Sequence, residues 1–156
     1  VSTKLIVAGN ESSNNEMESL ADEADYRLKE LGLNPAAEVL PMANSDRGVA
    51  ISVILEFENG FASGFAVRSP NEDVSETIQR AVEPIQKALV SNSSVDGFLA
   101  DQLLLALIQA KGRSVLTVDE ITERLKTMVW VIKQFLPIPI TVLGKTGESG
   151  KLIVER

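Results

Sequence analysis

The chain has 156 residues and a formal net charge of -7, and 44% of its residues are hydrophobic. It contains no cysteine and no histidine, which excludes disulfides, thiolate metal sites, cysteine nucleophiles and imidazole bases within these residues. No apolar run is long enough for a membrane helix and the first residues do not resemble a leader, so we expect a cytoplasmic protein. Because the chain begins at Val1, we expect a trimmed product or a piece of a longer protein.

The first part of the chain predicts one helix among four strands. The expected elements are a strand at residues 3–8, a helix at residues 14–31, and strands at residues 37–41, 49–57 and 61–67. Ser13 and Glu16 form a capping box at the start of the helix, and Gly32 is typical of its carboxyl end. The alternating strands flank Asn59-Gly60, which predicts a type I′ hairpin turn. Gly64 indicates a weakened strand or a bulge.

The second part predicts three helices and three short strands. The helices are expected at residues 71–89, 96–110 and 121–132, and the strands at residues 114–116, 140–143 and 151–155. Pro84 predicts a kink in the first of these helices. The second is apolar almost all round, which favours burial between layers. Thr117 and Glu120 form a second capping box, which predicts the start of the third helix.

These elements predict an α+β fold, an α/β sandwich with helices packed on a mixed, mostly antiparallel sheet. We expect two lobes, residues 1–92 and 93–156, in one compact unit. Residues 1–105 hold 7 basic and 17 acidic residues, whereas residues 106–156 hold 8 and 5. Because the acidic part repels phosphates, we do not expect non-specific nucleic-acid binding.

Two stretches resemble a known family. Val95-Asp-Gly-Phe-Leu-Ala-Asp-Gln-Leu-Leu-Leu105 is similar to the aromatic-Leu-Ala-Asp-Gln-Leu segment of RNA 3'-terminal phosphate cyclases, and Phe135-Leu-Pro137 resembles how those proteins finish. Residues 64–89 also resemble the family, and residues 1–60 resemble its inserted domain more faintly. The resemblance implies the carboxy-terminal part of a cyclase-like protein, with the repeat architecture shared by enolpyruvyl transferases and an amino-terminal half upstream.

The resemblance also implies a nucleotide pocket and possible ligands. The pocket would be lined by Phe98, Leu99, Ala100, Asp101 and Gln102, with the aromatic ring against the base or ribose. ATP and Mg would be the cofactors, and RNA or a protein would be the partner. In the alternative interpretation, Asp101 and Gln102 are structural and hydrogen-bond a neighbouring loop. No residue is predicted as a metal ligand.

The family's nucleophilic histidine, which attacks ATP and carries AMP, is not matched here. Counting back from Phe135 places that position at Arg124, or at Glu123 with a one-residue offset. Arginine is protonated and offers no lone pair, so no catalytic residue is predicted. Arg124 and Lys126, with Lys111 and Arg113, are a candidate phosphate patch or ordinary solvated charges.

Three hypotheses follow. The first is a cyclase-like protein without adenylylation activity, which acts as a binding or assembly module in RNA processing. The second is a fragment of an active ATP-dependent RNA 3'-phosphate cyclase. The third is a small oligomeric α/β ligand-binding domain that is unrelated to RNA and whose sheet edges pair between subunits.

Overall fold

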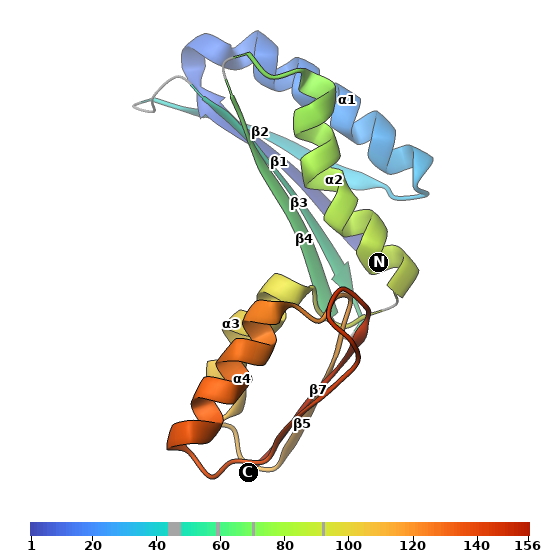
Figure 1. Cartoon of the computed structure of the whole chain (residues 1–156). Helices are drawn as coiled ribbons and strands as arrows, with labels where there is room; N and C mark the ends of the chain where they lie inside the picture. Colours follow the sequence, from blue (N-terminus) through green and yellow to red (C-terminus); the bar gives the residue numbers. More distant parts are fainter. Residues whose placement is uncertain (44–47, 59, 70, 92) are drawn as a thin grey trace. The chain divides into compact units, whose positions relative to one another are not determined.

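The computed structural model describes residues 1–43, 48–58, 60–69, 71–91 and 93–156. Within these ranges the chain divides into two compact units, residues 1–86 and residues 87–156. The division falls inside a helix, whereas the sequence suggested a boundary in the polar segment that follows it. Each unit packs helices on a sheet, so the α+β fold is confirmed (Figure 1).

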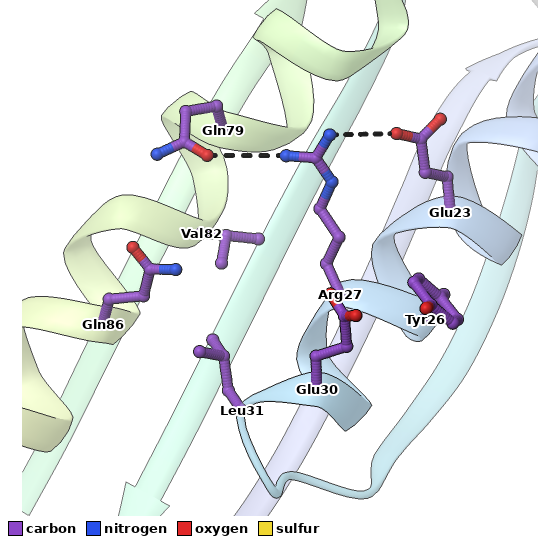
Figure 2. Close-up of a pocket in the computed structure, with 8 residues that line it drawn as sticks. All are labelled: Glu23, Tyr26, Arg27, Glu30, Leu31, Gln79, Val82 and Gln86. Carbon is purple, nitrogen blue, oxygen red and sulfur yellow. Dashed lines mark hydrogen bonds and ion pairs between the residues drawn. The ribbon is translucent and has the colours of Figure 1, made fainter.

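The first unit is built on a four-stranded mixed sheet of order β2-β1-β3-β4. Its elements are β1 (Ser2–Asn10), a short 3-10 helix η1 (Glu11–Ser13), α1 (Asn14–Glu30), β2 (Pro35–Met42), β3 (Val49–Phe57), β4 (Gly60–Arg68) and α2 (Val74–Ser91). Strands β1 and β2 are parallel, and α1 is the crossover between them, whereas the other pairs are antiparallel. Figure 2 shows α1 and α2 side by side on one face of the sheet.

Helix α1 ends as the sequence predicts but begins differently. The Leu33 amide donates to the Leu28 carbonyl at 3.0 Å and the Gly32 amide to Lys29 at 2.9 Å, with Gly32 at φ 78°. This pairing is a Schellman motif, in which glycine adopts the left-handed conformation without a Cβ clash. The capping box at the other end is wrong, because the Ser13 side chain makes no capping hydrogen bond. Asn10 caps the preceding 3-10 helix instead.

The β3–β4 hairpin is confirmed, and Gly64 has a different role from the expected one. Phe57 pairs with Gly60, and the register continues to Val49 and Arg68 without a bulge. The turn type depends on Asn59, which lies outside the described residues. A Cβ at Gly64 would lie 1.7 Å from the Ala81 carbonyl oxygen. Glycine therefore lets α2 lie directly on β4. Helix α2 runs through Pro84 without a break.

The second unit packs two helices on a three-stranded antiparallel sheet of order β5-β7-β6. Its elements are α3 (Gly97–Leu107), β5 (Arg113–Val118), α4 (Glu123–Phe135), β6 (Ile140–Leu143) and β7 (Gly150–Glu155). The centre of its core is formed by fully buried apolar side chains, among them Leu104, Ile121, Leu125 and Leu152. Figure 1 shows α3 and α4 on the same face of β5 and β7.

Two predictions about the second unit are wrong. Thr117 is not a helix cap but a strand residue, whose hydroxyl accepts from the Ser94 amide at 2.8 Å. Helix α3 is not buried all round, because Phe98 is 68% exposed and Leu105 is 52% exposed. Its buried face is instead formed by Gly97, Ala100, Asp101 and Leu104. In the described ranges, no helix combines the length and apolarity needed to cross a membrane.

Candidate functional site

The segment predicted to line a nucleotide pocket forms the first turns of α3, and its side chains point to different faces. Asp96 caps the helix, with its carboxylate accepting from the Leu99 amide at 2.7 Å. Ala100 and Asp101 are buried, Leu99 is half-buried, and Phe98 and Gln102 are exposed. The five residues therefore do not share a surface, and the two that are largely exposed, Phe98 and Gln102, lie one helical turn apart.

Asp101 joins the two helices of the second unit. It is 2% exposed, and its carboxylate accepts from the Thr122 hydroxyl at 3.3 Å and from the Arg124 Nε. The Thr122 hydroxyl also accepts from the Leu125 amide at 3.0 Å, so this residue caps α4. A buried carboxylate needs such partners because burial without them is costly. Asp101 therefore has the structural role that the sequence left open, and it also orients Arg124.

Arg124 lies between the buried carboxylate and an exposed ring. Its guanidinium carbon is 5.2 Å from the centroid of the Phe98 ring, which is cation–π geometry. Its side chain remains 55% exposed although its Nε is bonded to Asp101. Phe98, Gln102 and Arg124 consequently form one accessible surface, which we call the α3/α4 end surface.

Glu123 and Lys126, which lie next to this surface on α4, are hydrogen-bonded to a loop. The Thr146 hydroxyl accepts from the Lys126 Nζ at 2.5 Å and donates to the Glu123 carboxylate at 2.5 Å. The same loop is fixed to the start of α4, because the Gly147 amide donates to the Ile121 carbonyl at 3.0 Å. Glu123, the alternative position for the family's nucleophile, is thus held by a hydroxyl.

The four cations of the candidate phosphate patch form two separate pairs. Arg113 begins β5 and bonds Glu155 at 3.1 Å, with Lys111 in the preceding turn. Arg124 and Lys126 lie near the other end of that strand, where Val118 bridges to Val95 just before α3. Six strand residues separate the two ends by about 17 Å. The structure therefore does not gather the four into one patch.

Asp119 is a polar residue that the sequence did not single out. Burial raises the pKa of its carboxyl, and the nearby Asp96 and Glu120 raise it further, while the amides of Gly97 and Glu120 lower it. One of its oxygens, Oδ1, is buried without a hydrogen-bond partner. The side chain as a whole is half-buried. No sequence pattern marks it, because one of its partners is the Gly97 amide, which lies far from it in the chain.

The described residues do not supply a magnesium site of their own. In those ranges, no three acidic side chains gather closely enough to hold a metal ion. Asp101 is already bound by Thr122 and Arg124.

A second concave region lies in the first unit, between α1 and α2. It has a volume of about 390 Å³ and is lined by Glu23, Tyr26, Arg27, Glu30, Leu31, Gln79, Val82 and Gln86. Figure 2 shows Arg27 reaching across it, bonded to Glu23 at 3.1 Å and Gln79 at 3.5 Å. Because the charged groups across this groove satisfy one another, it shows no chemistry that selects a ligand.

The chain belongs to the RNA 3'-terminal phosphate cyclase family, whose model matches residues 14–142. It is 30% identical to an RNA 3'-terminal phosphate cyclase of Thermococcus gammatolerans over 141 residues, which are 89% of this chain and 40% of the relative. It is 29% identical to one from Methanopyrus kandleri over 132 residues, 81% of this chain and 38% of the relative. A third, from Thermococcus onnurineus, is 41% identical over 76 residues, 49% of this chain and 22% of the relative. The chain thus spans well under half the length of these curated relatives.

The residues that sequence reasoning missed are mainly the partners of those it named. Thr122 is the cap of α4, but the Thr117 pattern five residues earlier matched a capping box better. Thr146 acts through a tertiary contact, 20 residues from Lys126 in the chain. The one available signal for Thr122 was its own position, because threonine is a favoured N-cap and it directly precedes Glu123 and Arg124.

Proposed function

We propose that this chain provides a binding surface in RNA processing within the cell, and that it does not itself accept AMP from ATP. The observation that supports this proposal is the setting of Arg124. This residue stands where the resemblance places the family's nucleophilic histidine, and it is held by Asp101 and Phe98.

An arginine in this setting binds phosphate but does not attack it. Its guanidinium has only donors and no lone pair for phosphorus. Glu123, at the alternative position, is engaged by Thr146, and the chain has no histidine to replace either residue. The second unit therefore lacks an imidazole nucleophile at both candidate positions.

The α3/α4 end surface has groups suited to a nucleotide or an RNA end. The exposed Phe98 ring offers a face on which a base stacks. The guanidinium of Arg124 lies beside this ring on a side chain that is 55% exposed, and it suits a phosphate. The Gln102 amide, one turn along α3, both donates and accepts. A short RNA that carries a 3'-phosphate is the ligand class that uses all three groups.

Binding is measured by calorimetry with a single-stranded RNA oligonucleotide that ends in a 3'-phosphate. Phe98→Ala is expected to weaken binding about tenfold, because stacking on an aromatic side chain contributes about 1–3 kcal/mol per base. Phe135→Ala is the matched control, since Phe135 is also an exposed aromatic but lies at the far end of α4. Equal effects of the two substitutions, or no binding by the wild type, would contradict the proposed surface.

Nucleotide transfer is tested separately with ATP labelled in its α-phosphate. The protein incubated with labelled ATP and magnesium is expected to carry no covalent AMP after denaturation. A labelled protein band would overturn the non-catalytic part of the proposal.

A labelled band in the same experiment would favour the second candidate, a fragment of an active cyclase. The names of the relatives favour this candidate, because each is an RNA 3'-terminal phosphate cyclase. The third hypothesis, a domain unrelated to RNA cyclases, is contradicted by the family match.

A further inference from the structure

The two helices of the second unit expose a surface rich in apolar side chains. Between Gln102 and Gln109, α3 has no charged side chain, and after its first turn α4 has a single charged residue, Lys133. Lys133 is two residues after Val131, so these two side chains face different sides of the helix. The exposed large apolar side chains of the two helices are Phe98, Leu105, Trp130, Val131 and Phe135. Aromatic side chains with few charges are typical of the centre of a protein interface.

This surface contains a hollow between the two helices. The hollow has a volume of about 210 Å³ and is lined by Leu105, Thr127, Met128, Val131 and Ile132. Trp130 lies beside it, because residues three apart, such as Thr127 and Trp130, are neighbours on a helix surface. Its side chain is 64% exposed. A large apolar group therefore projects next to an apolar hollow.

Three polar side chains in and beside the hollow are already hydrogen-bonded within their own helices. Each donates to the carbonyl of the residue four positions earlier, Thr127 at 2.9 Å, Gln134 at 3.3 Å and Gln109 at 3.0 Å. A partner that covers this surface breaks none of these bonds. Covering it therefore avoids the cost of burying these donors unpaired.

We propose that α4 packs against α4 of a second copy of this chain, about a two-fold axis between Trp130 and the hollow. The Trp130 ring of each copy then enters the hollow of the other copy, between Leu105 and Val131. In a two-fold interface the same patch meets itself, so a projecting group and a hollow on one surface fill each other. Aromatic side chains in such pockets are frequent anchors of protein interfaces.

The charge distribution favours this surface as the contact between two copies. The chain has a net charge of -7, so two copies repel each other where acidic surfaces meet. The residues that line the hollow are uncharged. In the first turn of α4, Glu123, Arg124 and Lys126 are bonded within their own unit. Two copies can thus approach here without bringing like charges together at the centre of the contact.

The contact lies apart from the α3/α4 end surface. Leu105 is seven residues after Phe98, and Val131 is seven residues after Arg124, which is two turns or about 10 Å along each helix. Phe98→Ala is therefore expected to leave the dimer unchanged. Dimer formation and RNA binding can accordingly fail independently of each other.

Sedimentation of the whole chain over a range of concentrations tests the proposal. The wild type is expected to form a dimer, and Trp130→Ala is expected to raise its dissociation constant about 30-fold or more, because both anchors are lost. Val131→Glu is expected to raise it about tenfold or more, since it places a carboxylate in each covered hollow. Leu143→Glu is the matched control, because Leu143 is an exposed apolar residue on β6 of the same unit. Circular dichroism checks that the variants keep the fold. A monomeric wild type, or a dimer that Trp130→Ala leaves unchanged, would overturn the proposal.

Fluorescence reports the surroundings of Trp130 directly, because it is the one tryptophan of the chain. Its emission is expected to move to shorter wavelength, and its quenching by acrylamide to fall, as the concentration rises through the dissociation constant. A dimer in which Trp130 stays as accessible to acrylamide as in the monomer would contradict the proposed contact. A monomer whose Trp130 is protected only when a 3'-phosphorylated RNA oligonucleotide is added would also contradict it, because the hollow would then belong to the RNA surface.

Discussion

The two units of the chain pack helices on a sheet in the same general way but differ in their buried polar groups. In residues 1–86, α2 approaches β4 at Gly64, and the described buried polar side chains are the threonines Thr3 and Thr77. In residues 87–156, two carboxylates are buried around the helices: Asp96 caps α3, and Asp101 joins α3 to the start of α4. The first unit thus has a close backbone contact between α2 and β4, and the second adds hydrogen bonds to buried acids.

This difference predicts which substitutions each unit tolerates least. Close backbone packing tolerates no added atoms, because the neighbouring groups cannot move independently. A buried acid tolerates no loss of its partners, because an unsatisfied charge or oxygen in the interior is costly. The same region of the second unit carries the α3/α4 end surface, so its stability and its proposed binding role share residues.

The largest effect is expected from Gly64→Val in the first unit. Its Cβ would lie 1.7 Å from the Ala81 carbonyl oxygen, so α2 must move away from β4. We expect a loss of about 3 kcal/mol in the free energy of unfolding, measured by urea titration. Gly48→Ala is the control, because nothing lies within 4 Å of its Cβ position. A loss below that of the control would show that the first unit is not limited by this contact.

Asp101→Ala should have the next largest effect, in the second unit. It removes the acceptor of the Thr122 hydroxyl and of Arg124, and we expect a loss of about 1.5 kcal/mol. The loss is modest because Arg124 is half exposed and its charge is screened by solvent. Arg113→Ala breaks an exposed pair with Glu155 and should change stability by less than about 0.5 kcal/mol. Similar losses from the two variants would remove the proposed role of the buried acid.

The sequence predicted the elements of both units well, because their apolar periodicity and turn residues are local. The Schellman end of α1, the hairpin around residue 60 and the helix at Phe98 were all readable from neighbouring residues. Patterns that needed a tertiary partner were read wrongly. Ser13 and Thr117 both match a capping box, but Glu16 turns to Arg68 and Thr117 turns to Ser94.

The candidate site was predictable only as a segment. The Leu-Ala-Asp-Gln-Leu run identified α3, but a run of neighbours on a helix cannot show which side chains share a face with another element. The link from Asp101 to Arg124 spans 23 residues, and it became visible only when α3 and α4 were placed together. The separation of Lys111 and Arg113 from Arg124 depends in the same way on the direction of β5.

A smaller loss is expected from Gly32→Ala at the end of α1. Gly32 has φ 78°, a left-handed conformation that costs an L-residue about 1 kcal/mol. The measurement is again the free energy of unfolding in urea. No atom lies within 4 Å of the Cβ position, so the loss reports backbone strain without a clash. If Gly32→Ala cost as much as Gly64→Val, close packing would not be the main constraint on the first unit.

The smallest effect, and the only expected gain, is from Asp119→Asn. Burial raises the pKa of the Asp119 carboxyl, so the folded chain holds its proton more tightly than the unfolded chain. This carboxyl therefore favours folding at pH values below its unfolded pKa of about 4, and that contribution is lost as the pH rises through the raised folded value. Asparagine removes the charge, so we expect the variant to gain about 2 °C in Tm at neutral pH and to lose this advantage near pH 3.

Glu72 in the first unit is the counterpart, because the Ser69 amide lowers the pKa of its carboxyl. Its contribution is present above the ordinary pKa of glutamate and lost as the pH falls through the lowered value, so Glu72→Gln should lower the Tm at neutral pH. Melting curves of both variants across this pH range test whether the Asp119 carboxylate destabilises its unit at neutral pH while the Glu72 carboxylate stabilises the other. Tm shifts of the same sign at neutral pH would contradict this difference.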